Sequence, residues 1–591
     1  MECDRRLMAG RGKSVAVGRL RFTKLGVVVA ASLMNAAAWA QNVPAPSQVA
    51  PPQIVPPSST ARIAIPQVPA GAAIPAEAKR LSFRLTGVHI KGEFPELAGE
   101  RKTLSDPLVG RRVTVADIFE FADKIQQIYV RAGYPLVRIV IQPQEIEGSA
   151  RIELRVIDGF VERLDLDALD ARLRDYVGAV LAPLVGQTHL KQAELERRLL
   201  IAGDAAGLTL NATFSAGRKE GGSVLILTGR YKPVSVSVYT DNAMPRVFGN
   251  YQLVTAVSAN SVLGFGEQIT VSAAGLPNDS FPNSDPVRRY LSGRAIFPIG
   301  IDGLKFEVGV TNGVTTPRAD RSAATQGLLN QAYARLSYDI IKSRDGELTA
   351  FGRFDATNEE LDTLLFAPPL PLSLDRVRAL RGGLEGVWRL HDTGTTVNFD
   401  TTFSRGLDAF GARSAADATF LLPLSRQGAD AEFYKWNGRV EITQALPEGF
   451  SATAILAGQT SFNKPLLNSE QYVIDGSRFL SGFTAGSLAG DTAWVARAEL
   501  GRAVAVPFEA AGVTLTPYLF GATGERKYVA PTFLEIGNLQ ATNYGAGLRV
   551  NLVSPNTTMP SAYGFVEWSR RTSNDRSRDG DRVFTGLALQ Y

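Results

Sequence analysis

The sequence contains very little cysteine and histidine. Among 591 residues there is one cysteine, Cys3, and there are three histidines, His89, His189 and His391. A single cysteine forms no internal disulfide, and three scattered histidines without HExxH spacing form no zinc site. A phosphate-binding loop is also incomplete, because Gly12-Lys13-Ser14 lacks the earlier glycine that such a loop requires. We therefore expect a protein that is not an enzyme and that has no catalytic residues, metal or cofactor.

The sequence also lacks long apolar runs after residue 40 and any excess of charge there. No run of 18 or more apolar residues occurs, so we expect no helix that spans a membrane. The net charge of +5 comes from residues 1–40, where seven basic residues face two acidic ones. The remaining chain is balanced, and binding to nucleic acid is not expected.

Residues 1–40 have the features of a secretory signal peptide. Arginines and lysines precede the apolar run Leu25–Met34, and Ala38-Trp39-Ala40 has the A-x-A pattern of a cleavage site. The alternative, a membrane anchor, is disfavoured because the run is too short to cross ~30 Å of hydrocarbon. Met8 is an alternative start. Cleavage would remove Cys3 and leave a mature protein without a thiol.

Residues 41–80 are rich in proline, alanine, glutamine and serine. This composition is typical of an extended, mobile linker with no core of its own.

Residues 81–163 predict a small α+β domain. Strands are expected at 83–90, 136–141 and 152–157, with turn residues between the last two. A helix should begin at Thr114, which is followed by Asp117, and end at Ala132-Gly133. Residues 164–230 repeat this style, with a helix at 190–201 and strands at 208–214 and 224–227.

From residue 231 to residue 591 the pattern changes to alternation of polar and apolar residues. Ala334, Leu336 and Tyr338, for example, alternate with polar or charged neighbours. Alternation alone fits a soluble β-sandwich and a transmembrane barrel about equally well. The length favours the barrel, since it accommodates about 16 strands of ~9–11 residues with their turns. The chain also ends on an alternating, aromatic-terminated segment that resembles the assembly signal of outer-membrane proteins, Leu587, Leu589 and Tyr591.

Several short motifs follow one another along the chain, and their order and spacing can be compared with those of known families. The first domain contains Gly133-Tyr134, Pro143-Gln144 and Gly159, and the second contains Ala206-Gly207-Leu208. Asn260–Glu267 follows at the start of the barrel region. Together these motifs resemble the two-partner secretion transporters (TpsB proteins) of the ShlB/FhaC/HecB haemolysin activation and secretion type. The resemblance covers nearly everything after residue 80.

The resemblance implies an all-β transmembrane barrel of 16 antiparallel strands in the outer membrane of a Gram-negative bacterium, preceded by two periplasmic POTRA domains. It implies one secreted partner, a long β-helical exoprotein (TpsA-like) such as a haemolysin or adhesin, which is exported unfolded through the barrel without ATP. An extended segment of that partner can add to an edge strand of a POTRA sheet. The other implied partners are the outer-membrane assembly machinery, periplasmic chaperones and outer-membrane lipid.

Two motifs depart from the family pattern. Family members carry an inward-folded loop with a Val-Arg-Gly-Tyr/Phe motif, whose arginine meets an aspartate in a Phe-x-Asp-x-Gly strand of the barrel wall. Here the loop reads Leu480-Ser481-Gly482-Phe483 and continues to Asp491, and the wall reads Phe520, Ala522 and Gly524. Losing arginine and aspartate together leaves no unpaired charge but removes the usual ionic lock. We hypothesise that Phe483 packing and Arg478 hold the loop instead; the alternative is that Arg478 is simply solvated.

Residues 41–80 contain no clear helix, so we do not expect a barrel plug of the family type. Two other functions stay open: an assembly factor that inserts other barrels, which usually has more POTRA domains, and a passive porin, which needs none.

Overall fold

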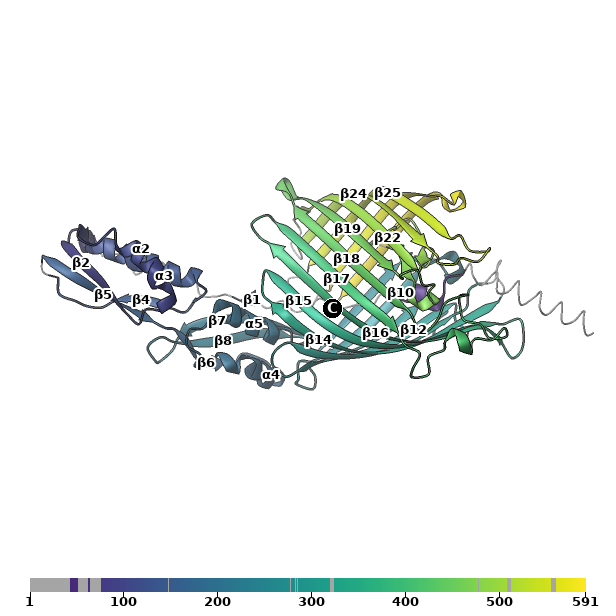
Figure 1. Cartoon of the computed structure of the whole chain (residues 1–591), viewed down its shortest axis with the longest axis horizontal. Coiled ribbons are helices and arrows are strands. Elements are labelled where there is room, and N and C mark those ends of the chain that lie inside the picture. Colours follow the sequence, from purple (N-terminus) through teal and green to yellow (C-terminus); the bar gives the residue numbers. More distant parts are fainter. Residues whose placement is uncertain are drawn as a thin grey trace, which may run out of the picture.

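The computed structural model describes residues 43–51, 62–63 and 76–591, except residues 147, 277, 282, 284, 319–323, 477, 508–511 and 554–559. The predicted signal peptide and most of the predicted linker lie outside the described residues. Two small α/β units lead in a line to one large barrel (Figure 1). Within the described ranges, no helix has the length and apolar character needed to cross a membrane.

The first α/β unit is a four-stranded sheet covered by helices. Its sheet order is β3-β2-β5-β4. The helix α3 begins at a reciprocal cap, in which Thr114 and Asp117 each accept a hydrogen bond from the other's backbone. Its apolar side, including Phe121 and Ile125, packs on Ile152 of the sheet. The elements are η2 (Ala76–Lys79), β2 (Ser82–Lys91), η3 (Pro95–Leu97), α2 (Ala98–Ser105), β3 (Arg112–Thr114), α3 (Val115–Arg131), β4 (Arg138–Ile141) and β5 (Ser149–Ile157).

The second α/β unit has the sheet order β1-β7-β8-β6. Because β6 pairs with β8, the second unit begins at Phe160, and the predicted boundary at residue 164 falls inside a strand. Its outermost strand, β1, comes from the predicted linker and pairs in parallel with β7. The elements are β1 (Arg62–Ile63), β6 (Phe160–Asp165), α4 (Ala171–Leu181), η4 (Ala182–Leu184), α5 (Gln192–Gly203), β7 (Leu208–Ala216) and β8 (Gly222–Tyr231).

The remaining strands close into an antiparallel barrel. Both β22 and β23 pair with β24 and count as one wall strand, so the described residues form sixteen wall strands. The wall consists of β9 (Val234–Asp241), β10 (Gln252–Asn260), β11 (Gln268–Gly275), β12 (Arg288–Ile299), β13 (Leu304–Thr315), β14 (Thr325–Lys342), β15 (Gly346–Thr363), β16 (Leu370–Leu390), β17 (Thr395–Gly406), β18 (Tyr434–Ala445), β19 (Phe450–Thr460), β22 (Thr492–Arg502), β23 (Val504–Val506), β24 (Gly512–Lys527), β25 (Asn538–Val553), β26 (Ser561–Ser573) and β27 (Gly580–Gln590).

Shorter elements lie in the connections between wall strands. They are η5 (Arg246–Phe248), η6 (Ala415–Asp417), η7 (Pro447–Gly449), η8 (Asn468–Glu470), β20 (Tyr472–Val473), β21 (Ala489–Gly490) and η9 (Arg576–Arg578). We call the barrel end beside the α/β units the near rim and the opposite end the far rim.

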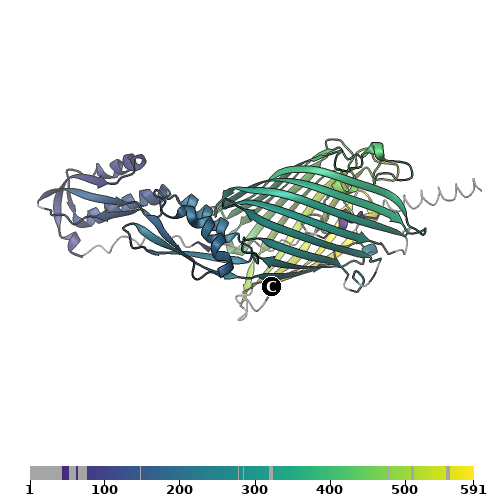
Figure 2. The same ribbon diagram turned by 90° about the horizontal axis from the view of Figure 1, so that it is seen from below.

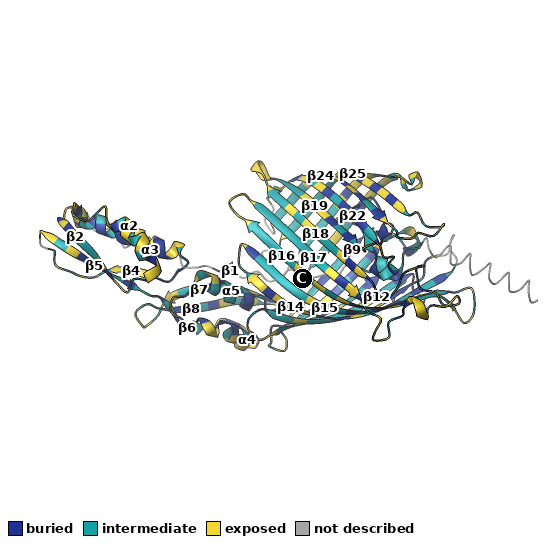
Figure 3. Ribbon diagram, in the orientation of Figure 1, coloured by how far each residue is buried: buried dark blue, intermediate teal, exposed yellow. Residues whose placement is uncertain are grey.

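Buried and exposed residues alternate along parts of the barrel wall (Figure 3), as expected when successive side chains point to the lumen and to the outer surface. On β16, Asp375, Val377 and Ala379 are buried toward the lumen, whereas Leu380 and Leu390 are exposed outward. The barrel closes where β27 pairs with β9. At this seam Leu587, Leu589 and Tyr591 are exposed on the outer surface, and the Tyr591 backbone exchanges hydrogen bonds of 2.9 and 3.0 Å with Val236.

The second α/β unit lies against the near rim (Figure 2) and is fixed there by partly buried charges. Asp204, at the end of α5, lies 2.9 Å from the Lys305 ammonium group and 3.0 Å from that of Lys342. Burial raises the pKa of Asp204, but the two ammonium groups outweigh this effect and hold the pKa below its ordinary value. Arg197 on α5 adds an ion pair of 3.3 Å with Asp302. The unit is therefore mounted on the barrel through charge as well as chain connectivity.

Candidate functional site

Residues 43–51 lie inside the lumen near the far rim, where η1 (Pro46–Val49) forms one short 3-10 turn (Figure 1). The expectation of a mobile linker without a plug is therefore wrong for these residues. They form no amphipathic helix that sequence patterns would reveal. Their position depends on groups that only the closed barrel brings together. We call residues 43–51 the plug segment.

The plug segment is held mainly through its backbone. The Tyr290 hydroxyl donates to the Pro46 carbonyl at 2.6 Å, and the Arg288 guanidinium donates to the Val49 carbonyl at 2.7 Å. The Ser47 N–H donates to Glu359 at 2.8 Å. Val49 is buried in an apolar pocket formed by wall and loop residues, Ala243, Met244, Phe248, Val287 and Phe584. A chain segment without charge can thus occupy this part of the lumen.

The connection between β19 and β22, residues 461–491, also folds into the lumen, and we call it the inward loop. Its predicted tip residues Leu480 and Phe483 are buried together with Leu488. They pack on the barrel wall against a cluster that contains Ile474, Val495, Ala522, Leu539 and Ala541. Ala522 of the predicted wall motif therefore contributes an apolar surface under the loop.

An ionic network lies directly beside the loop tip. Arg497 on β22 is completely buried and pairs with Glu567 on β26 at 2.7 Å and with Glu499 at 2.7 Å. The same guanidinium donates to the Ser481 hydroxyl at 3.0 Å, and Ser481 also donates to Glu567. Phe520 lies under Arg497, with the guanidinium carbon 4.0 Å from the ring centroid.

The loop is therefore joined to an ion pair, although the usual arginine and aspartate are absent. The ion pair is formed by residues other than Arg478, the replacement that the sequence analysis named. The cation stands on the wall at Arg497, and the loop contributes the Ser481 hydroxyl. Arg497 on β22 lies opposite Ala522 on β24, so the small alanine stands next to the cation. The sequence showed Arg497 and Glu567 only as charges in alternating strands, and their pairing required the barrel to close.

Further arginines of the wall bind the loop backbone. Arg571 donates to the Gly482 carbonyl at 2.8 Å, and Arg582 donates to the Ser481 carbonyl at 3.2 Å. A Cβ atom at Gly482 would lie 3.1 Å from the Arg571 and Ser569 side chains, so the tip fits closely. Gly524 is similarly confined, because a Cβ there would lie 2.6 Å from the Trp494 carbonyl oxygen.

Arg478 has a different environment from the other predicted loop residues. It is exposed, and in the part of the chain that the structure describes no carboxylate lies within 4.0 Å of its guanidinium. The hypothesis that Arg478 locks the loop stays a prediction with a direct mutational test.

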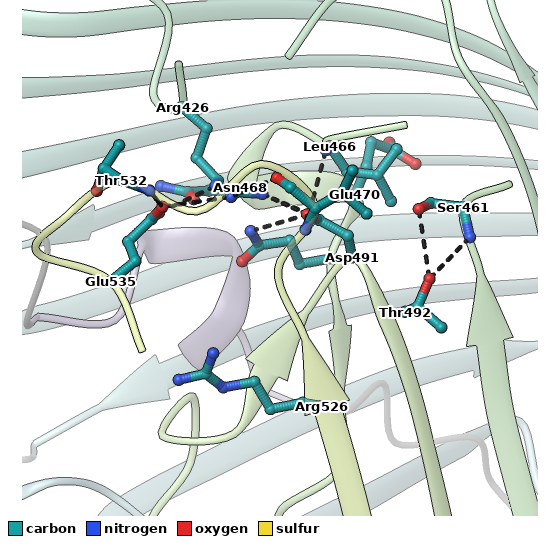
Figure 4. Close-up of polar contacts among 12 residues, drawn as sticks. Arg426, Ser461, Leu466, Asn468, Glu470, Asp491, Thr492, Arg526, Thr532 and Glu535 are labelled. Carbon is teal, nitrogen blue, oxygen red and sulfur yellow. Dashed lines mark hydrogen bonds and ion pairs between the residues drawn. The ribbon is translucent and has the colours of Figure 1, made fainter. Parts of the chain in front are cut away.

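Asp491, at the end of the inward loop, joins three far-rim connections (Figure 4). Its fully buried carboxylate pairs at 2.5 Å with Arg426, which belongs to the β17–β18 connection. It also accepts hydrogen bonds from the Leu466 N–H at 3.1 Å and from the Val529 N–H at 2.8 Å. Arg426 extends the network to Glu535 in the β24–β25 connection at 3.1 Å.

A second buried carboxylate fixes the start of the inward loop. Glu470 pairs with Arg381 on β16 at 2.8 Å and with Lys435 on β18 at 2.9 Å. The plug segment and the inward loop also touch each other, because the Gln48 amide donates to the Gln471 side chain at 2.8 Å. The far-rim half of the lumen is therefore filled by two segments in contact.

Toward the near rim the lumen is lined by many charged side chains. A cavity of about 420 Å³ is lined by arginines and carboxylates, including Arg335, Arg353, Arg439, Glu385 and Asp400. A polar inner wall is typical of barrels that conduct water or polar chains.

The predicted POTRA residues lie at close contacts inside and between the α/β units. Tyr134 is buried and donates to Glu96 at 2.8 Å, and Gln144 bridges to the Glu153 backbone at 2.9 Å. Hydrogen bonds from its own backbone and from the Tyr134 hydroxyl lower the pKa of Glu96. Pro143 precedes Gln144 in the segment between β4 and β5.

Three predicted glycines mark junctions. The Gly133 carbonyl accepts from Gln192 of the second unit at 2.8 Å. A Cβ at Gly159 would lie 2.1 Å from the Leu136 carbonyl oxygen, and one at Gly207 would lie 2.2 Å from that of Lys232. Neither position has room for a side chain, which explains glycine there.

The family model described as "Haemolysin secretion/activation protein ShlB/FhaC/HecB" matches residues 221–549, more than half of the chain. The chain belongs to this family. A second model, "POTRA domain, ShlB-type", matches residues 83–159 within the first α/β unit.

Relatives of this ShlB-type chain are transporters. It is 23% identical over 483 residues to the heme/hemopexin transporter protein HuxB of Haemophilus influenzae, covering 80% of this chain and 81% of that protein. It is 23% identical over 425 residues to the outer membrane transporter CdiB of Escherichia coli, covering 71% and 68%. The ShlB-type chain is similar to proteins described as transporters over most of its length.

Solved structures confirm the fold. CdiB from Escherichia coli superimposes with a TM-score of 0.64 at 17% identity, covering 97% of this chain and 98% of that one. CdiB from Acinetobacter baumannii gives a TM-score of 0.55 at 13% identity, covering 86% and 90%. The ShlB-type transporter thus lies in the outer membrane, with its near rim and POTRA domains on the periplasmic side and its far rim facing the cell exterior.

Proposed function

We propose that this transporter exports one secreted partner protein, which reaches its POTRA domains unfolded and crosses the membrane through the barrel lumen. The observation that carries the proposal is the plug segment. Its nine residues are not part of the wall, have no ionisable side chain and are held by a few hydrogen bonds. A segment held in this way can leave and make room for an extended chain.

The POTRA sheets supply a means of recognition. The pairing of Arg62–Ile63 with β7 is an added strand, so this edge accepts extended backbone in parallel register. In the first domain β4 is an outermost strand of the sheet that the described residues form. Main-chain hydrogen bonds at such edges bind an unfolded partner with little dependence on sequence. A long β-helical exoprotein of the haemolysin or adhesin kind fits this role, since its outward folding prevents return without ATP.

The test compares the culture supernatant and the outer membrane with and without this gene. We expect one or two very large proteins to disappear from the supernatant, while the barrel proteins of the outer membrane stay at normal levels. A broad loss of barrel proteins would instead identify an insertase. Unchanged supernatant and membrane would leave a passive pore and contradict the proposal.

A further inference from the structure

The outer surface of β16 contains a sharp change from apolar to basic side chains. From Leu390 back to Leu380, the outward positions hold only leucine, glycine and tryptophan over eleven residues. That length matches the ~9–11 residues that a tilted strand needs to cross the hydrocarbon layer. The next two outward positions toward the far rim are Arg378 and Arg376. The apolar band therefore ends at these arginines, at the level of the outer-leaflet head groups.

A third arginine faces the same area from the neighbouring strand, which lies beside β16 in Figure 1. Arg405 on β17 lies opposite Leu380 in the strand register. Arg376 and Arg405 are exposed, and Arg378 is half-buried. Three guanidinium groups on two adjacent strands repel one another, so an anion bound between them is stabilising.

The protein supplies no such anion within the residues that the structure describes. No carboxylate there lies within 4.0 Å of the guanidinium of Arg376, Arg378 or Arg405. Arg570, another outward arginine, instead pairs with Asp581 at 3.1 Å. Glu360 and Asp362 also face outward, but they lie one and two rows nearer the far rim than Arg376. These carboxylates limit how far toward the exterior an anion can sit.

Arg378 is held in place by the protein. Its guanidinium donates to the Phe410 carbonyl at 3.1 Å and to the Asn358 side chain at 3.0 Å. Asn358 lies opposite Asn330, whose side chain accepts from Asn312 at 2.8 Å. A polar belt thus runs across the outer surface at the level of the arginines. The exposed rings of Phe403 and Phe410 stand beside them.

We propose that Arg376, Arg378 and Arg405 form a binding site for the phosphate groups of an anionic lipid in the outer leaflet. Guanidinium groups bind phosphate oxygens through paired N–H donors, and the level of the cluster places it at lipid head groups. The apolar band below the arginines and the flanking phenylalanines contact the acyl chains. This inference rests on the outer-membrane location of the barrel and is independent of the protein that it exports.

The test measures lipid retained by the purified full-length protein in detergent, using native mass spectrometry. The probes are a bisphosphorylated outer-leaflet glycolipid, its dephosphorylated form and inorganic phosphate alone. The variant R376Q/R405Q keeps the anchored Arg378 and should fold normally. R570Q is the matched control, because it removes an outward arginine that already has a carboxylate partner.

We expect the wild-type protein and R570Q to bind the phosphorylated lipid equally, and R376Q/R405Q to bind it at least tenfold more weakly. Equal retention by R376Q/R405Q would overturn the site. Equal affinity for the dephosphorylated lipid would show that only acyl contacts matter, and would also overturn it. Displacement of the lipid by millimolar inorganic phosphate would assign the site to free phosphate and contradict the lipid.

Discussion

The plug segment and the inward loop occupy the same half of the lumen but are held by different chemistry. The plug segment carries no ionisable side chain and is bound through its carbonyl groups, Ser47 and the Gln48 amide. In the inward loop the buried Glu470 pairs with two wall cations, and the buried Asp491 pairs with Arg426 of the β17–β18 connection. Its tip contacts the buried cation Arg497.

This difference in bonding makes the plug segment easier to remove from the lumen than the inward loop. Water or a passing polypeptide can replace these hydrogen bonds, whose net contribution is about 0.5–1.5 kcal/mol between neutral groups and about 1.5–3 kcal/mol where Arg288 or Glu359 carries the charge. Separating a buried ion pair leaves charges without partners and costs about 3–5 kcal/mol. We infer that the plug segment leaves during transport while the inward loop keeps its base and tip anchored.

The largest effect is expected when Arg497, the wall cation that contacts the loop tip, is removed. Arg497→Ala leaves Glu567 buried without its cation, while Glu499 keeps Arg549, so the free energy of unfolding should fall by about 3–5 kcal/mol. Urea unfolding of the barrel in detergent measures this change. Adding Glu567→Gln should recover part of the loss, because one stranded charge disappears. A loss below about 1 kcal/mol, on the scale of an exposed ion pair, would show that the loop tip is not held by this network.

A second test concerns the base of the loop. Asp491→Asn keeps the shape of the side chain but leaves Arg426 buried without its closest anion, and should cost about 2–3 kcal/mol. The far-rim connections should then loosen and become sensitive to protease added to intact cells. Asp408→Asn, in the exposed part of the same β17–β18 connection, is the control. Equal protease resistance of both variants would contradict a joining role for Asp491.

The third test addresses the plug segment. Deleting residues 43–51 should raise the conductance of single barrels in planar bilayers several-fold, because it empties this part of the lumen. Arg288→Gln, which loosens the Val49 carbonyl, should give a smaller increase. Arg289→Gln is its matched control, because the adjacent side chain faces outward. An unchanged conductance after the deletion would mean that the inward loop alone closes the lumen.

The smallest effect is expected at Arg478. Because this residue is exposed, Arg478→Ala should leave the amount of exported protein unchanged. The free energy of unfolding should stay within about 0.5 kcal/mol of the wild type. Secretion assays alongside Arg497→Ala measure both positions in one experiment. A marked fall in export for Arg478→Ala would support the sequence-based hypothesis that this arginine locks the loop.

Sequence analysis predicted a large part of this molecule. Alternation after residue 231 and a cap at Thr114 depend on local rules that hold wherever the chain folds. The family resemblance then supplied the barrel, the POTRA units and the position of the inward loop. Gly159 and Gly207 have a tertiary reason, since the backbone of another element approaches each of them too closely for a side chain.

The sequence by itself determined which residues face the lumen and which face lipid, because a strand repeats every two residues. Only the closed barrel decided which luminal charges become partners. Arg497 meets Glu567 although 70 residues separate them, and Arg288 meets the Val49 carbonyl across 239 residues. Pairs at such separations depend on the strand register and on closure of the barrel. The plug segment has no periodic pattern, so its conformation is set by the wall residues around it.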